Sequence, residues 1–227
     1  MSVAFQLGTA FADAMDAQDS LAYFRERFFI PTGRDGKEWI YLCGHSLGLQ
    51  PKTARDYIDQ ELHDWAALGV EGHFRAKNPW MPYHRLLSEQ TATLVGAVAK
   101  EVVVMNSLTV NLHLMMISFY RPTVQRHKIL VERGAFPSDQ YAVKSQIRFN
   151  GFDPAQALIE LTPREGETCI RDEDVQQMIE RRGNEIALVL IGGVNYASGQ
   201  VFDMKQITKL GHQNGCKVGF DLAHAAG

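Results

Sequence analysis

The stretch Ile186-Ala187-Leu188-Val189-Leu190-Ile191 decides the fold class, because it holds six consecutive apolar residues. A strand with one face in water alternates apolar and polar residues, whereas a strand covered on both faces of a parallel sheet stays apolar throughout. A helical pattern over Asp203–Asn214 follows, closed by Gly215, and Cys216–Asp221 indicates another strand. This order of strand, helix and strand is typical of a parallel sheet.

The same alternation continues toward the N-terminus. Lys128–Glu132 is predicted to be a strand, and Pro137 is suited to open the helix behind it. Further helices are predicted to begin at Asp153 and Asp172. We therefore expect an α/β fold with a mostly parallel sheet and flanking helices, in which ligands gather at the carboxyl ends of the strands.

The segment before residue 120 is predicted to hold three helices and one short strand. The first helix is expected from Pro51 to Gly69, and the second over about residues 84–99. Val102–Val104 is a β-branched run, predicted to be a strand that leads into a helix over Val110–Phe119. The apolar face of the first helix consists of Ala54, Ile58, Leu62, Trp65 and Leu68.

Composition and charge narrow the class of function. The chain has 227 residues, 45% of them hydrophobic, which is enough to bury a sizeable core. A formal net charge of -3 and a pI near 6.2 give no basic field for nucleic acid or anionic membranes. We expect small-molecule chemistry, with neither nucleic acid nor a membrane as partner.

The cysteines and the N-terminal segment indicate the cellular setting. Cys43, Cys169 and Cys216 are odd in number, far apart and never in a C-x-x-C pair, which argues against a disulfide framework and a zinc site. The N-terminal segment lacks the basic start and unbroken apolar core of a signal peptide. We predict a reducing, cytoplasmic setting and no metal site.

Polar groups gather directly after three of the predicted strands. Ser107 or Thr109 can cap the next helix, or the free N–H groups at that helix start can hold a phosphate, with the threonine hydroxyl as a further donor. Phe136 can be a core aromatic, or it can stack on a planar heterocycle. Asp221 can cap the segment behind it, or it can face a pyridine nitrogen and keep it protonated.

Other familiar signatures are absent. The sequence has no G-x-G-x-x-G, G-x-x-x-x-G-K-[ST], H-E-x-x-H or G-x-S-x-G motif, which disfavours dehydrogenases, P-loop NTPases, zinc proteases and α/β-hydrolases. The histidines are scattered, as surface or packing residues are. His73 is the exception, since it lies in a polar stretch that either reaches over a pocket or forms an ordinary exposed loop.

Several motifs, taken together and in order, resemble those of the kynureninase family. The resemblance extends over nearly the whole chain. Its main motifs are residues 44–51 (GHSLGLQP), 106–111 (NSLTVN), 136–139 (FPSD) and 219–227 (GFDLAHAAG), supported by residues 163–167, 193–196 and 198–200.

The resemblance implies a type I pyridoxal-phosphate fold, aminotransferase-like, in a homodimer. It implies a role in cofactor or substrate binding for ten residues of this chain. Leu108 and Thr109 would hold the cofactor phosphate, Phe136 would stack on its ring, Pro137, Ser138 and Asp139 would complete that loop, Asp221 would pair with the pyridine nitrogen beside His224, and Ser46 and His73 would lie near the substrate.

Two residues of this chain depart from the family pattern, and the Schiff-base lysine of the family has no counterpart among the 227 residues. The family usually has asparagine where this chain has His45, and often a hydroxyl residue where this chain has Gly192. The Schiff-base lysine of the family lies beyond the position of Gly227, so no catalytic residue is assigned and the 227 residues alone are expected to be inactive. We expect a sheet that is incomplete at its C-terminal side, as in a fragment of a longer protein.

The activity implied is the hydrolysis of L-kynurenine or 3-hydroxykynurenine to anthranilate or 3-hydroxyanthranilate and L-alanine, in tryptophan catabolism and NAD biosynthesis. Residues 1–50 would form an N-terminal arm and part of the small domain, and residues 51–227 a truncated large cofactor-binding domain. Two alternatives remain open: another type I pyridoxal-phosphate lyase such as a cysteine desulfurase, and a fragment that binds the cofactor without catalysis.

Overall fold

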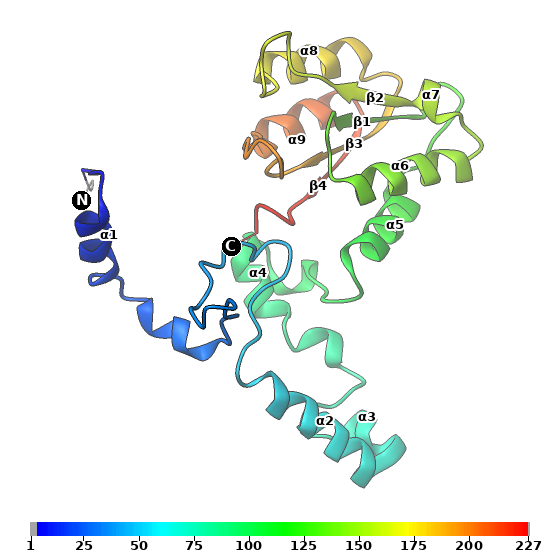
Figure 1. The fold of residues 1–227 in the computed structure, drawn as a ribbon. Helices are drawn as coiled ribbons and strands as arrows, with labels where there is room; N and C mark the ends of the chain where they lie inside the picture. Colours follow the sequence, from blue (N-terminus) through cyan, green and yellow to red (C-terminus); the bar gives the residue numbers. More distant parts are fainter. Residues whose placement is uncertain (1–3, 227) are drawn as a thin grey trace. The chain divides into compact units, whose positions relative to one another are not determined.

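A parallel sheet organises the C-terminal part of the chain in the computed structural model, which describes residues 4–226. Within the described residues the sheet has four strands in the order β2-β1-β3-β4, and every neighbouring pair is parallel. The strands are β1 (Lys128–Glu132), β2 (Leu158–Leu161), β3 (Ile186–Gly192) and β4 (Lys217–Asp221). The predicted α/β fold with a parallel sheet is confirmed (Figure 1).

Helices cover both faces of this sheet. Helices α5 (Leu108–Phe119) and α6 (Pro137–Phe149) pack on one face, where Ile129 and Val131 are buried. Helices α8 (Asp172–Arg182) and α9 (Met204–Gln213) pack on the other face. Leu130, which lies between Ile129 and Val131 in the sequence of β1, is buried on this face. Successive strand residues point to opposite faces, so an apolar strand is buried on both sides.

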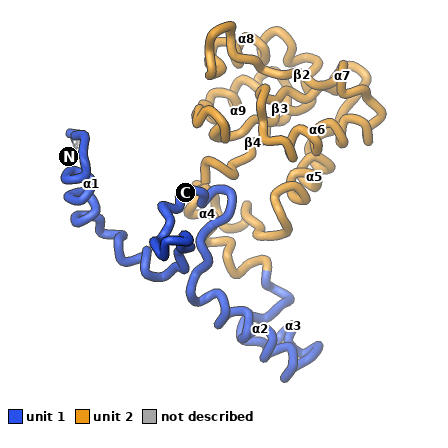
Figure 2. Tube along the Cα trace, in the orientation of Figure 1, with its two compact units in different colours: residues 1–83 blue, residues 84–227 orange. Residues whose placement is uncertain are grey.

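The chain divides into two compact units, residues 1–83 and 84–227 (Figure 2). The predicted domain division after residue 50 stays a prediction. The remaining elements are α1 (Thr9–Asp16), η1 (Ala22–Arg27), α2 (Ala54–Leu68), η2 (Gly69–Glu71), α3 (Gly72–Arg75), η3 (Tyr83–Arg85), α4 (Ser88–Val95), η4 (Ala99–Glu101) and α7 (Pro154–Ala157).

Two details differ from the sequence prediction. Val102–Val104 is irregular and forms no strand, with Val103 and Val104 49% and 41% exposed. A β-branched run becomes a strand only where a neighbouring strand pairs with it, and propensity alone is too weak to decide. Strand β2 was not predicted, because Asp153 and Pro154 indicate a helix start, and that helix ends after one turn.

The apolar face predicted for the first long helix lies largely open in the described part of unit 1. On α2, Ile58, Leu62 and Trp65 are each more than half exposed. The buried residue of this helix is Asp64, whose carboxylate accepts a hydrogen bond from the backbone N–H of Lys77 at 2.9 Å. Over residues 4–226, no helix is long and apolar enough to cross a membrane.

Candidate functional site

Three neighbouring strands end side by side at the carboxyl edge of the sheet. Glu132 is the last residue of β1, Gly192 of β3 and Asp221 of β4. Gly192 pairs in register with Asp221, and β1 lies on the other side of β3. The strand order therefore places a carboxylate on each side of one glycine.

Glu132 is buried at this edge and bonded to that glycine. Its side chain is only 4% exposed, and its two carboxylate oxygens accept hydrogen bonds from the backbone N–H of Gly192 at 3.1 and 3.3 Å. Burial raises the pKa of Glu132, and the charge of Asp221 acts in the same direction. The N–H donors of Gly192 and of Glu132 itself oppose that shift, because they favour the charged form.

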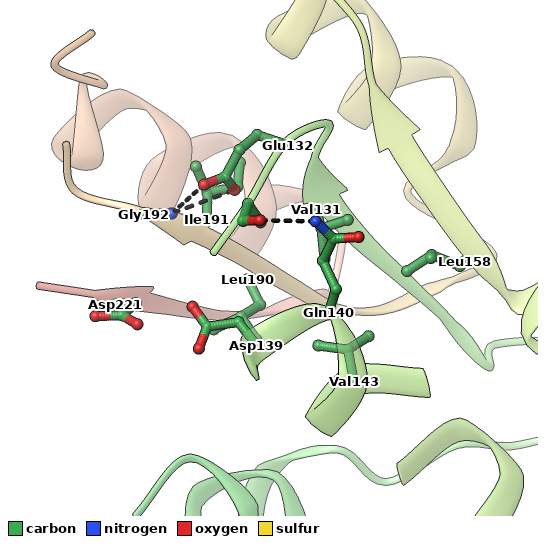
Figure 3. A pocket seen from close by; sticks show the side chains of 11 residues that line it. Val131, Glu132, Asp139, Gln140, Val143, Leu158, Leu190, Ile191, Gly192 and Asp221 are labelled. Carbon is green, nitrogen blue, oxygen red and sulfur yellow. Dashed lines mark hydrogen bonds between the residues drawn. The ribbon is translucent and has the colours of Figure 1, made fainter. Parts of the chain in front are cut away.

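Asp139 supplies a second buried carboxyl group. It is the third residue of α6, which begins at Pro137 directly behind the loop after β1. Burial, followed by interaction with Asp221 and the charge of Glu132, raises the pKa of Asp139 from 3.8 to about 7, while Ser138 lowers it. Figure 3 shows the side chains of Asp139 and Asp221 pointing toward one another.

Asp221 is half-buried and serves two purposes. One oxygen, Oδ1, accepts a hydrogen bond from the backbone N–H of Ala223 at 2.8 Å, as the capping alternative for Asp221 requires. The carboxyl group also faces Asp139, and both residues line the same two small cavities. Capping and ligand binding are therefore compatible at this aspartate.

Aromatic side chains form another wall of the site. The ring of Phe136 meets the ring of Tyr196 edge-on, with centroids 5.3 Å apart, and Tyr196 lies 6.1 Å from the imidazole of His224. The Phe136 side chain is 45% exposed, so the alternative of a core aromatic is wrong. All three rings line the cavity that contains Asp221.

The two cavities share Glu132, Asp139, Gly192 and Asp221. Each has a volume of about 20 Å³, enough for about one water molecule. No lysine or arginine of the described chain lines either cavity. The chemistry of this edge, with three carboxyl groups and aromatic walls, suits a planar ligand that carries a positive charge, as a protonated pyridine does, although neither cavity as it stands has room for such a ring.

The start of α5 offers unsatisfied donors to an anion. Ser107 precedes the helix and makes no side-chain capping bond, and Asn106 before it has a φ of 39°, in the left-handed region that asparagine tolerates. Leu108 is exposed and Thr109 half-buried. The capping bond expected of Ser107 is absent from the described chain, so the first N–H groups of this helix remain open to another acceptor.

A side-chain hydrogen bond locates the C-terminal end of α5 relative to the sheet. Its far end is tied to the opposite edge, where the Tyr120 hydroxyl donates to the His127 carbonyl at 2.6 Å, directly before β1. A helix of this length rises about 18 Å and a five-residue strand about 17 Å, so α5 is about as long as the strands of the sheet. A helix running alongside the strands from that opposite edge would bring Thr109 toward the edge that holds Asp221.

Ser46 and His73 lie in the other unit, which is described by itself. Ser46 is exposed in a turn, where its N–H donates to the Cys43 carbonyl at 3.0 Å. His73 contacts the Val70 carbonyl through Nδ1 at 2.9 Å and meets the Trp80 ring edge-on at 5.4 Å. Because a carbonyl only accepts, Nδ1 carries the proton and Nε2 is left as an acceptor in the neutral ring.

Two residues of the site were not predicted from the sequence. The sequence marks Glu132 only as the end of a strand, although an acid that ends an apolar strand is the same signal that identifies Asp221. Tyr196 lies in a loop held by Asn195, whose side chain accepts hydrogen bonds from the N–H groups of Ala197 and Ser198. A tyrosine in a polar loop carries no comparable local signal.

Comparison with known proteins identifies the family. The family described as Aminotransferase class-V matches residues 40–227. This chain belongs to that family. The solved structure of the cysteine desulfurase CsdA from Escherichia coli covers 89% of this class-V chain and 48% of its own, with a TM-score of 0.65 and 18% identity. The cystine C-S lyase C-DES has the same TM-score at 15% identity, over 80% of this chain and 46% of its own. These likenesses concern the fold alone.

Closer relatives are proteins named Kynureninase. The protein from Koribacter versatilis is 66% identical over 226 residues, which is 100% of this class-V chain and 53% of the relative. The protein from Myxococcus xanthus is 60% identical, over 98% of this chain and 52% of the relative. The chain thus spans about half the length of the curated relatives it matches.

Proposed function

We propose that these residues build part of the pyridoxal-phosphate site of a kynureninase, which hydrolyses L-kynurenine to anthranilate and L-alanine. The observation that carries the proposal is the cavity shared by Asp139, Asp221 and Phe136, which offers carboxyl groups and an aromatic wall to a cationic ring. The relatives named Kynureninase, at 49 to 66% identity, support this choice within the family.

Asp221 has the central role in this proposal. A carboxylate about 4 Å from a protonated ring nitrogen, at an effective dielectric constant near 20, contributes roughly 4 kcal/mol. That energy corresponds to about three pKa units in favour of the protonated ring. When bound, pyridoxal phosphate supplies an electron sink for a carbanion, and the charge of Asp221 makes that sink effective.

The other residues of unit 2 hold and orient the cofactor. Phe136 stacks on the ring, with Pro137 and Ser138 starting the first turn of α6, which carries Asp139. His224 lies beside the ring. At the start of α5, the N–H groups near Leu108 and the Thr109 hydroxyl bind the phosphate, which a helix N-terminus favours.

Ser46 and His73 contact the substrate in this proposal. His73 can accept a hydrogen bond at Nε2, since its Nδ1 proton is already donated to Val70. We further propose that the protein is a cytoplasmic homodimer, that it also accepts 3-hydroxykynurenine, and that its product serves NAD biosynthesis. The division into an arm over residues 1–50 and a cofactor domain over residues 51–227 belongs to the same proposal.

The test measures which substrate the whole protein cleaves and how one substitution changes its affinity for the cofactor. We expect anthranilate fluorescence to appear with kynurenine and pyridoxal phosphate, and no sulfide with cysteine. Asp221→Asn should weaken cofactor binding by about a hundredfold or more, because most of the roughly 4 kcal/mol of charge interaction is lost. Asp172→Asn is the matched control, since Asp172 is exposed on α8.

Three results would contradict the proposal. Sulfide from cysteine without anthranilate from kynurenine would favour a desulfurase. Weak, reversible cofactor absorbance with no product and no borohydride-trapped adduct would favour a binding fragment. An affinity unchanged by Asp221→Asn would remove Asp221 from the site.

A further inference from the structure

The proposed cofactor site leaves one buried acid without a role. A protonated pyridine carries one positive charge, and Asp221 is sufficient to pair with it. Yet Glu132 lines both cavities beside Asp139 and Asp221 and is the most deeply buried of the three acids, at 4% exposure. Burying a carboxyl group with no lysine or arginine lining its cavity costs free energy, which the backbone N–H donors of Glu132 offset in part and a cationic ligand would offset further.

We propose that Glu132 is a positioning residue of the cofactor site, whose buried negative charge beside Gly192 strengthens binding of the cationic ring. The inference rests on the proposed function, because the ligand is the cofactor of that reaction. Glu132 does not touch the ring in this account. It acts across the glycine at the end of β3 and on the two aspartates that face the ligand.

The bonds of Glu132 favour a charge over a purely structural role. Both of its oxygens accept from the N–H of Gly192, at 3.1 and 3.3 Å, which stabilises the ionised form. A glutamine could tie β1 to β3 through one such bond without the cost of burying a charge. Both oxygens are engaged by one donor, so the group is held in a fixed orientation at the wall of the cavity (Figure 3).

The charge of Glu132 reaches Asp139 directly. It is among the causes that raise the pKa of Asp139, after burial and Asp221. The titratable groups around Asp139 are Glu132 from β1, Asp221 from β4, and Tyr196 and His224 across the adjoining cavity. A cation in the cavity offsets this repulsion, so cofactor binding and ionisation of Asp139 favour each other.

The experiment uses 4′-deoxypyridoxine 5′-phosphate, which has the ring nitrogen and the phosphate but no aldehyde. Its binding needs no Schiff-base lysine, so the dissociation constant of the whole protein reports the non-covalent site alone. A unit charge on the order of 10 Å from the ring nitrogen, at an effective dielectric constant near 20, changes affinity by about tenfold. Glu132→Gln should therefore weaken binding of this probe about tenfold.

Two further measurements separate charge from structure. In the protein without ligand, carbon NMR should show the Asp139 carboxyl titrating at lower pH in Glu132→Gln than in the wild type. Glu160→Gln is the matched control, since Glu160 is an exposed acid on the neighbouring strand β2, and neither quantity should change. Glu132→Asp keeps the charge and should bind the probe within about threefold of the wild type, a difference below 1 kcal/mol.

The outcomes are distinguishable from those of the proposed function. If the wild type binds the probe, Asp221→Asn loses it and a folded Glu132→Gln matches the wild type in both measurements, this inference is refuted and the proposed function stands. If the wild type does not bind the probe, the proposed function itself fails. If Glu132→Gln does not fold, Glu132→Asp decides, and a folded Asp variant with a tenfold loss of affinity refutes the role of the charge.

Discussion

Replacing Asp139 by asparagine should stabilise the cofactor-free protein, and only above a definite pH. The pKa of Asp139 rises from 3.8 to about 7 in the folded chain, chiefly through burial and then through Asp221. At 1.36 kcal/mol per pKa unit, the ionised folded state is disfavoured by at most about 4 kcal/mol. Asparagine has nearly the same shape and never ionises, so Asp139→Asn removes this cost.

The sign of the pH dependence follows from proton binding. Below about pH 4 the carboxyl group is protonated in both the folded and the unfolded chain, so Asp139 adds no pH dependence. Between about pH 4 and 7 the unfolded chain has released the proton and the folded chain keeps it, so stability falls as pH rises. Above about pH 7 the whole cost is present.

The assay is urea unfolding of wild type and Asp139→Asn at several pH values between 4.5 and 8. The difference between the two proteins isolates Asp139 from the other acids. It should be small near pH 4.5 and grow toward a gain of a few kcal/mol at pH 8. Asp172→Asn should show no such growth. A gain that is the same at pH 4.5 and pH 8, or no gain at pH 8, would refute the reasoning.

Two further predictions concern stability away from the site. Arg126 donates to three backbone carbonyls at the other end of the sheet, at 2.6 to 3.1 Å, so Arg126→Met should lower the free energy of unfolding by about 3 kcal/mol in urea titrations. A Cβ at Gly211 would come within 2.4 Å of Val218 Cγ2, whereas one at Gly219 would lie 3.6 Å from Leu190 Cδ1. Gly211→Ala should thus cost about 1–3 kcal/mol, and Gly219→Ala should leave the melting temperature nearly unchanged.

The strands that could be predicted from sequence are those whose burial dictates their composition. Ile186–Ile191 and Lys128–Glu132 were predicted within one residue of their observed bounds, because a strand covered on both faces needs apolar residues without a break. The starts of α6 and α8 were also predicted, since Pro137 and Asp172 act within their own turn. Local chemistry is visible in the sequence.

The errors arise where a structure depends on a distant partner. Leu158–Leu161 is four residues long and becomes β2 because β1 is available beside it, while the β-branched Val102–Val104 has no partner strand in the described chain. The same holds for the open face of α2, whose pattern predicts a helix but not what covers it. Pairing over long separations is not encoded in any short window.

The acid cluster combines both situations. Glu132 and Asp221 each end an apolar strand, which the sequence shows, but their proximity follows from strand order, with β3 between β1 and β4. Gly192 ends that middle strand. A Cβ at this position would lie 3.0 Å from Glu132 Oε1, so any residue with a side chain would require the carboxylate to shift. The glycine that departs from the family pattern thus leaves space for Glu132. The lack of a hydroxyl side chain at position 192 should therefore be considered together with Glu132 on the neighbouring strand β1, and not as the loss of one cofactor contact alone.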